Sequence, residues 1–363
     1  MMLNTILIGC ALTIFTSCHG QSSSRDANLS KTVSNFTVTV GDTVKELGYS
    51  LWIVFQDSKN NYWFGSNGEG VYRFDGKAII QYTTLHGLRN DSVRQIQEDK
   101  FGNLYFNTRK GVSKFDGQTF ISLIQVRSHA LDRGWKLQPD DLWFTGAQDS
   151  GVVYRYDVMT GGQSLYRLEF PKTQPGEDFL STYPRSKYPN MNFNPYDVYS
   201  IYKDSKENIW FGSGLLGVCR YNGKSVDWIT EDDVTELHDG ASNGVRSIIE
   251  DKDGYFWFSN TYYRYEVFEV GQEMKYKREK SIGNLEGYMS IARDKKDNLW
   301  IVTYSDGVWR YDGKTMTHYP IMEGNKTVTL FSIYKDRQGD LWLGTHDEGV
   351  YKFNGKIFER FRE

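Results

Sequence analysis

The chain has 363 residues, more than one ordinary hydrophobic core accommodates, and its formal net charge is −3. Length alone suggests two or three domains, but that expectation fails for chains built of repeats, so repeats are considered first. The near-neutral charge gives no ground for binding nucleic acid or an anionic membrane surface. Aromatic residues make up 15% of the chain and Gly (35) far exceeds Pro (7), a composition that favours β-structure with many tight turns.

The first residues have the character of an export signal. Residues 3–15 form an apolar run that is too short to span a bilayer, as in a signal peptide. The following Phe15-Thr16-Ser17-Cys18 resembles the lipobox of bacterial lipoproteins, in which the Cys is acylated. An ordinary signal peptide cleaved nearby is the alternative, because residues 1–5 contain no Lys or Arg. We expect residues 1–17 to be a signal peptide and residues 18–34 a flexible tether that is lipid-anchored through Cys18.

One repeat unit recurs through the rest of the chain. It is clearest at residues 198–223 and 330–361, where four short apolar runs are separated by turn residues. The first turn reads Asp-x-x-Gly or Asp-x-x-Asn, the second is Gly-rich, and the third is Asp-Gly or Asn-Gly. The last two dipeptides favour tight hairpins because a type I′ turn needs positive φ at both central residues. Each unit therefore predicts a four-stranded antiparallel sheet.

The aromatic residue of the second strand gives the register of seven such units. It is found at Trp63, Tyr105, Trp143, Trp210, Trp257, Trp300 and Trp342, with intervals of 42, 38, 67, 47, 43 and 42 residues. Four-stranded units at this spacing are typical of propeller blades. We expect the six Trp side chains to be buried between sheets, an interpretation that their shared register favours over a stacking platform for sugars or bases.

The predicted fold is all-β: residues 35–363 form a single seven-bladed β-propeller of four-stranded antiparallel blades. The long interval holds an insertion at about residues 170–197, and the third repeat lacks a clear first strand, with Trp135–Leu137 as the best remnant. Both terminal repeats have four strands, so we expect the ring to close without exchanging a strand. Residues 36–40 alternate like a strand and are expected to add to an edge near the closure.

The repeat resembles a known family. Asp-x-x-Gly-x-Leu-Trp-Phe-Gly-Thr followed by Gly-Val-x-Arg-Tyr-Asp-Gly is similar to the two-component-regulator propeller repeat over about residues 49–363. The resemblance implies an exported propeller of the kind that forms the ligand-sensing part of hybrid histidine kinases. Sensor kinases of the family continue into a further β domain, a transmembrane helix and a kinase. This sequence ends at Glu363, and the expectation is a stand-alone lipoprotein without kinase activity.

Two sets of residues invite a chemical interpretation that we do not favour. Acidic turns such as Asp251–Gly254 and Asp294–Asp297 lack the ligand spacing of an EF-hand, so we interpret them as carboxylates that stabilise turns, and we expect no metal. Cys219 occupies a strand position that is aromatic in other repeats. No His lies near it in sequence, which favours a small buried residue over a catalytic thiol.

A ligand is expected to bind on one face of the propeller. With strands named a to d from first to last in each blade, the d–a and b–c connections share one face, and they vary in length and chemistry, as binding loops do. The candidate ligand-binding residues on this loop face are His86, Arg89, Arg109, Lys110, Arg127, His129, Arg133, His238, Tyr304 and His346. The cations from the first three repeats suit an anionic group such as a uronate carboxylate.

Two functions of different classes fit these features. The first is a non-catalytic binding propeller of the bacterial cell envelope, anchored to a membrane (the outer membrane), which senses a glycan or scaffolds an envelope protein complex. The second is a lyase resembling virginiamycin B lyase or a polysaccharide lyase, with His129, His238 or His346 as general base. No catalytic constellation is visible in the sequence, which favours the first function, without a cofactor.

Overall fold

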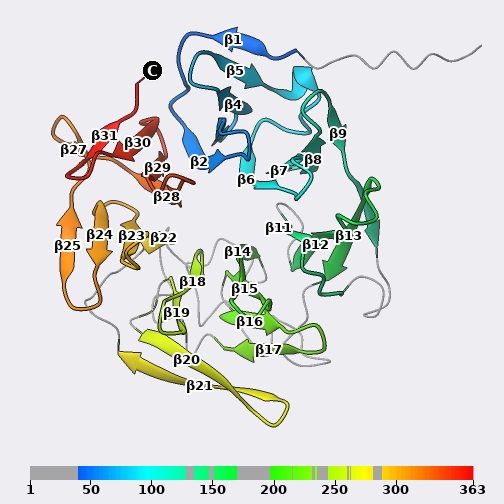
Figure 1. Cartoon of the computed structure of the whole chain (residues 1–363), viewed down its shortest axis with the longest axis vertical. Helices are drawn as coiled ribbons and strands as arrows, with labels where there is room; N and C mark the ends of the chain where they lie inside the picture. The colour runs from blue at the N-terminus through cyan, green and yellow to red at the C-terminus, as the bar shows by residue number, and fades with distance from the viewer. Residues whose placement is uncertain are drawn as a thin grey trace, which may run out of the picture. The chain divides into compact units, whose positions relative to one another are not determined.

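The computed structural model describes residues 40–127, 135–146, 151–169, 197–214, 216–230, 234, 244–259, 261, 263–280 and 288–362. Seven sheets follow one another along this part of the chain and stand in a ring (Figure 1). The chain is an all-β, seven-bladed propeller, as predicted. In six blades the first strand of the repeat lies innermost and the last strand lies toward the outside of the ring.

The regular blades repeat one antiparallel order of strands. In the first half they are blade one, β2 (Leu51–Gln56), β3 (Tyr62–Ser66), β4 (Val71–Phe74) and β5 (Ile79–Tyr82); blade two, β6 (Val93–Glu98), β7 (Leu104–Thr108), β8 (Gly111–Phe115) and β9 (Phe120–Ser122); and blade four, β14 (Val198–Lys203), β15 (Ile209–Ser213), β16 (Val218–Tyr221) and β17 (Val226–Ile229). A short 3₁₀ helix, η1 (Thr84–His86), connects blades one and two.

The second half of the ring has the same order. Its strands are blade five, β18 (Ile248–Glu250), β19 (Tyr255–Phe258), β20 (Tyr263–Val270) and β21 (Glu273–Lys280); blade six, β22 (Tyr288–Arg293), β23 (Leu299–Thr303), β24 (Val308–Tyr311) and β25 (Met316–Tyr319); and blade seven, β28 (Leu330–Lys335), β29 (Leu341–Thr345), β30 (Val350–Phe353) and β31 (Phe358–Arg360). The hairpin β26 (Met322–Glu323) and β27 (Lys326–Thr327) connects blades six and seven.

Blade three departs from the pattern. It contains β11 (Leu142–Thr145), β12 (Val152–Tyr156) and β13 (Ser164–Glu169), and its fourth strand is β10 (Ile124–Arg127), which precedes them in the chain. β10 pairs with β13 in parallel at the outer edge, so the second strand of this repeat becomes the innermost. The prediction of a first strand at Trp135–Leu137 is wrong, because these residues form no strand.

Side chains of blade two substitute for the missing strand. The amide of Gln97 donates to the carbonyl of Trp143 (2.7 Å), and the amide of Asn107 donates to the carbonyl of Thr145 (3.0 Å). These bonds satisfy two carbonyls of β11 that an inner strand would otherwise have to satisfy. The space left over is a pocket of about 340 Å³ between blades two, three and four.

The turn aspartates hold the second-strand aromatic residues. Asp204 accepts a hydrogen bond from the indole N–H of Trp210 (2.8 Å), while its other oxygen accepts the backbone N–H groups of Lys206 and Asn208. The same aspartate-to-aromatic bond, 2.8–2.9 Å long, recurs in five other blades, as Asp57–Trp63, Asp99–Tyr105, Asp251–Trp257, Asp294–Trp300 and Asp336–Trp342. The prediction that these carboxylates stabilise turns is therefore confirmed.

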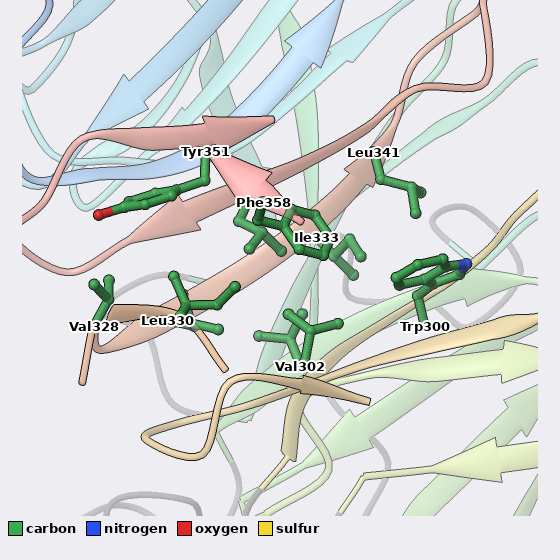
Figure 2. Close-up of a cluster of buried hydrophobic side chains, with 11 residues drawn as sticks. Trp300, Val302, Val328, Leu330, Ile333, Leu341, Tyr351 and Phe358 are labelled. Atoms are coloured by element: carbon green, nitrogen blue, oxygen red, sulfur yellow. The ribbon is translucent and has the colours of Figure 1, made fainter. Parts of the chain in front are cut away.

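The hydrophobic core is divided among the seven junctions between neighbouring blades. Each of seven clusters of buried side chains draws its residues from two adjacent blades. Figure 2 shows the junction of blades six and seven, where Trp300 and Val302 pack against Leu330 and Phe358. The six second-strand Trp side chains are at most 4% exposed, which confirms the predicted burial.

The ring closes without strand exchange. Blades one and seven each contain four strands of their own repeat, and Leu51 and Phe64 of blade one pack with Trp342 of blade seven. An additional strand, β1 (Asp42–Val44), pairs with β5 at the outer edge of blade one. The edge strand predicted at residues 36–40 thus has a counterpart a few residues later; residues 36–39 lie outside the described part of the chain.

Candidate functional site

Five of the innermost strands carry a β-bulge at the same position. In blade one, Leu51 pairs with Ser66 and Ile53 pairs with Gly65, which leaves Trp52 between them without a partner in the register. The corresponding residues of blades two, four, six and seven are Arg94, Tyr199, Met289 and Phe331. A β-bulge turns a side chain away from its regular alternation and is common beside functional sites.

These residues share a register that includes blade five. Each lies five residues before the turn aspartate of its repeat, and the residue at that position in blade five is Arg246, two residues before the start of β18. Blade three has no innermost strand of this kind. We define the central ring as Trp52, Arg94, Tyr199, Arg246, Met289 and Phe331.

Hydrogen bonds between blades fix the bulged backbone. The hydroxyl of Ser332 donates to the carbonyl of Trp52 (2.5 Å), and that of Ser200 donates to the carbonyl of Val245 (2.8 Å). Gly344 is required at one of these contacts, because a Cβ atom there would lie 2.3 Å from the carbonyl oxygen of Trp52. The side chains of the central ring are therefore held by backbone atoms that cannot shift independently.

Aromatic rings support the first arginine of the central ring. Trp52 stacks on Phe331 with ring centroids 4.2 Å apart, and the guanidinium carbon of Arg94 lies 4.4 Å from the centroid of Trp52. His346, at the end of the second strand of blade seven, lies 5.3 Å from Trp52. Blades seven, one and two thus contribute to one continuous stack of aromatic and cationic groups.

The second arginine has a similar environment. The guanidinium carbon of Arg246 lies 4.3 Å from the ring centroid of Tyr199, and its Nε is buried without a hydrogen-bond partner among the described residues. Burial lowers the pKa of Arg246. Burial and the positive charges of Arg109 and Arg246 lower the pKa of Arg94 to about 10, so three cations influence one another at the centre of the ring.

Three of the predicted ligand-binding residues lie beside the central ring. Arg109, Tyr304 and His346 each follow a second strand, on the predicted loop face. The backbone N–H groups of Arg109 and His346 donate to the residues that precede β6 and β28. Tyr304 is close enough to Arg246 to affect its pKa. Arg89 and Lys110 are two further candidates. They stabilise the loop that follows Arg109, since Nε of Arg89 donates a hydrogen bond to the carbonyl of Lys110 (2.5 Å).

Two other candidates lie away from the centre. His86 accepts a hydrogen bond from the N–H of Thr83 and lies 3.5 Å from Asp42 of the outermost strand of blade one, so it stabilises a connection at the periphery. Arg127 belongs to β10 at the outer edge of blade three, because the chain pairs there with β13 before it returns inward. The prediction that Arg127 lies in a loop is therefore wrong. His129, Arg133, His238 and Cys18 lie outside the described residues.

Sequence reasoning missed the central ring. The repeats can be aligned on the turn aspartate. Five residues before this aspartate the residue type changes between Trp, Arg, Tyr, Met and Phe, whereas six residues before it the residue is always Leu, Val or Tyr. This contrast is a signal in the sequence, because a residue that only fills the core keeps its character from one repeat to the next.

The opposite face is less flat than its short turns predict. A pocket of about 810 Å³ lies between the a–b turns of blades six and seven and the c–d turn of blade seven. Its lining is also cationic, with six Lys or Arg side chains against three Asp or Glu, and Lys352 lies 2.8 Å from Asp340.

No group of three or more metal-ligating side chains occurs among the described residues. Cys219 is fully buried in β16, where burial raises the pKa of its thiol. A nucleophilic thiol needs exposure and a lowered pKa, so the interpretation of Cys219 as a core residue is confirmed. Within the part of the chain that the structure covers, no helix has the length and apolar character needed to cross a bilayer.

The fold and the central ring define a β-propeller with a cationic and aromatic centre. Three segments, residues 192–214, 239–262 and 323–347, match the family model described as two component regulator propeller. These three segments are thus similar to the repeat that the sequence resembles, the two-component-regulator propeller repeat. A segment of 39 residues is also 49% identical to the curated "Histidine kinase P4" of Formosa agariphila, a match that covers 11% of this chain and 3% of that protein.

Solved structures share the fold at low sequence identity. The extracellular domain of the putative one component system BT4673 from B. thetaiotaomicron has a TM-score of 0.56 and 20% identity, over 90% of this chain and 40% of that domain. A streptogramin B lyase has a TM-score of 0.58 and 13% identity, over 89% of this chain and 99% of the lyase. A catalytically inactive virginiamycin B lyase from Staphylococcus aureus, solved with quinupristin, has a TM-score of 0.54 and 13% identity, over 86% and 99%. At these identities the likeness shows the fold alone.

Proposed function

We propose that the protein is a non-catalytic ligand-binding propeller of the bacterial cell envelope, and that its ligand binds on the loop face at the central ring. The observation that carries the proposal is the set of bulges at one register, which place aromatic and cationic side chains at the same height on the innermost strands. Rigid strands that present such groups are a suitable scaffold for recognition.

The structural comparison supports the location in this proposal. The extracellular domain of BT4673, which belongs to a putative hybrid two component system, shares the fold of this chain. We extend the comparison to export, to a lipid anchor at Cys18 and to a glycan or an envelope protein as the partner. A Cys18→Ser variant should then lose palmitate labelling and move from the membrane fraction to the soluble fraction.

A glycan array tests the proposed function directly. The wild-type protein should bind a defined subset of oligosaccharides, and Arg109→Glu should weaken that binding at least tenfold because it reverses a charge beside Arg94. Arg127→Glu and Lys206→Glu serve as matched charge reversals at the outer edge and in an a–b turn. Equal losses in all three variants, or no binding by the wild type, would contradict the proposal.

One observation favours a second function, that of a lyase. Nδ1 of His346 lies 3.1 Å from Asp347, and the imidazole lies beside Trp52 of the central ring. A histidine with a carboxylate partner suits a general base in an elimination. Cleavage of a streptogramin B antibiotic by the wild-type protein, lost in His346→Ala, would favour this function over simple binding.

A further inference from the structure

The central ring and the neighbouring Arg109 concentrate positive charge. Among the described residues, no Asp or Glu forms an ion pair with Arg94, Arg109 or Arg246, although ion pairs are common elsewhere on the propeller. Like charges in a partly buried place repel one another, and water compensates them poorly. Arg109 is exposed, but Arg94 and Arg246 are partly buried, and the described residues place no negative charge in an ion pair with either guanidinium group.

The two arginines of the central ring have the same kind of neighbour. Arg94 comes from blade two and Arg246 from blade five, which lie on different sides of the ring in Figure 1. Each guanidinium lies over an aromatic ring, Trp52 for Arg94 and Tyr199 for Arg246. Stacking fixes the plane of a guanidinium while its N–H groups remain available at the edge, and these N–H groups match the paired oxygens of an oxyanion.

The aromatic neighbours of the two arginines indicate which other chemical group an anionic ligand would carry. Trp52 and Phe331 form a stacked pair, and Tyr199 lies beside the second arginine. Flat aromatic side chains around a cationic centre suit a ligand that combines an oxyanion with a ring or another apolar face. A small inorganic ion would use the arginines alone.

We propose that the central ring binds an oxyanion between Arg94 and Arg246, and that the ligand is a small cyclic compound carrying a carboxylate, sulfate or phosphate group. This inference rests on the proposed function, because it specifies the ligand class for the same site. Arg109 contributes charge at the loop face, and Trp52 and Tyr199 position the ring of the ligand.

Calorimetric titration at low ionic strength tests the ligand class with four probes: sodium sulfate, D-glucuronate, oligogalacturonate and a neutral galacto-oligosaccharide of equal length. We expect the anionic sugars to bind at least tenfold more tightly than the neutral one. Arg94→Gln and Arg246→Gln should each weaken binding at least tenfold, whereas Lys206→Gln and Lys252→Gln in the a–b turns should not. Sulfate that binds as tightly as glucuronate would contradict the proposed cyclic ligand, because the aromatic side chains would then add nothing to the affinity.

Thermal unfolding separates binding from folding. Sulfate should raise the Tm of the wild type above that in chloride of equal ionic strength, since a ligand of the native state stabilises it. In Arg94→Gln this increase should disappear while the Tm without ligand is unchanged or higher, because a repelling charge is removed. A Tm that falls in Arg94→Gln and still responds fully to sulfate would overturn the inference.

The two proposals fail differently. If the neutral oligosaccharide binds as tightly as the anionic one and the arginine variants have no effect, the oxyanion inference is overturned and the proposed binding function stands. If no probe binds and the glycan array is also negative, both are overturned.

Discussion

The aspartate-to-tryptophan hydrogen bond is the residue-level feature that organises each regular blade. Its carboxylate accepts one indole N–H and two backbone N–H groups, so a single side chain ends a turn and fixes a core residue. Blade three shows what happens without it. Leu137 occupies the aspartate position there, and the indole N–H of Trp143 is buried without a partner in the described structure.

This difference predicts unequal effects of one substitution at two places. Trp210→Phe removes a hydrogen bond to a buried carboxylate, whereas Trp143→Phe removes a donor that has none among the described residues. Hydrogen bonds to charged groups contribute about 1.5–3 kcal/mol, so Trp210→Phe should cost about 2 kcal/mol more than Trp143→Phe. Urea unfolding of both variants measures the difference. Equal losses of stability would show that the hydrogen bond is not what fixes the indole.

The residues whose environment could be predicted best from the sequence are those that have the same structural role in every regular repeat. The turn aspartate and the second-strand aromatic residue, such as Asp204 and Trp210, recur in every regular repeat, and the environment they predict is the one observed. Arg94 and Arg246 were missed because their position varies from repeat to repeat. A β-bulge, which the sequence does not indicate, also changes the direction of Arg94. Arg127 was placed wrongly because nothing in residues 124–127 predicts a parallel edge strand.

At the scale of the element, the innermost strands of neighbouring blades lie so close together that one position of the second strand in blade seven has no room for a side chain. A Cβ atom at Gly344 would lie 2.3 Å from the carbonyl of Trp52 and 2.6 Å from Oγ of Ser332. Gly344→Ala should therefore destabilise the protein by about 1–3 kcal/mol through overpacking. Gly162→Ala is the control, because its nearest neighbour, the N atom of Ser164, would be 3.9 Å away. Similar unfolding midpoints for the two variants would contradict the account.

The c–d turns predict a dependence of stability on pH. The backbone N–H groups of Thr315 and Lys314 lower the pKa of Asp312 to about 2. A carboxyl group whose pKa is lower in the folded state than in the unfolded state, about 3.9, stabilises the fold above pH 4, and this contribution is lost as the pH falls toward 2. Stability of the wild type should therefore fall over that range.

Asp312→Asn is a matched variant, since Asn354 accepts the equivalent N–H groups in blade seven. It should fold and show a shallower loss of stability between pH 4 and pH 2, measured as Tm. Parallel curves for the wild type and the variant would mean that this turn does not contribute to the acid sensitivity of the protein.

At the scale of the whole molecule, the seven-bladed ring could be predicted because the same four-strand pattern occurs seven times along the chain. The missing innermost strand of blade three could only be suspected, since amide side chains of Gln97 and Asn107 compensate for it across a blade junction. Contacts that join distant repeats leave no periodic pattern in the sequence. The centre of the ring, where six repeats meet, was for that reason the hardest part to foresee.

The ring also explains why one face can specialise. Each innermost strand of the regular blades begins on the loop face. In five of these strands a bulge near the start places one side chain at the centre of the propeller, on the loop face. The a–b turns at the other end of these strands contain the structural aspartates. The proposed binding site and the structural aspartates therefore lie at opposite ends of the same strands.

Amide hydrogen exchange with and without the tightest-binding oligosaccharide of the array tests the central claim most directly. The account predicts slower exchange on binding at the starts of β2, β6, β14 and β28, around Trp52, Arg94, Tyr199 and Phe331, with no change in the a–b turns. Slower exchange confined to the a–b and c–d turns of blades six and seven would place the ligand in the pocket of the opposite face and contradict the account.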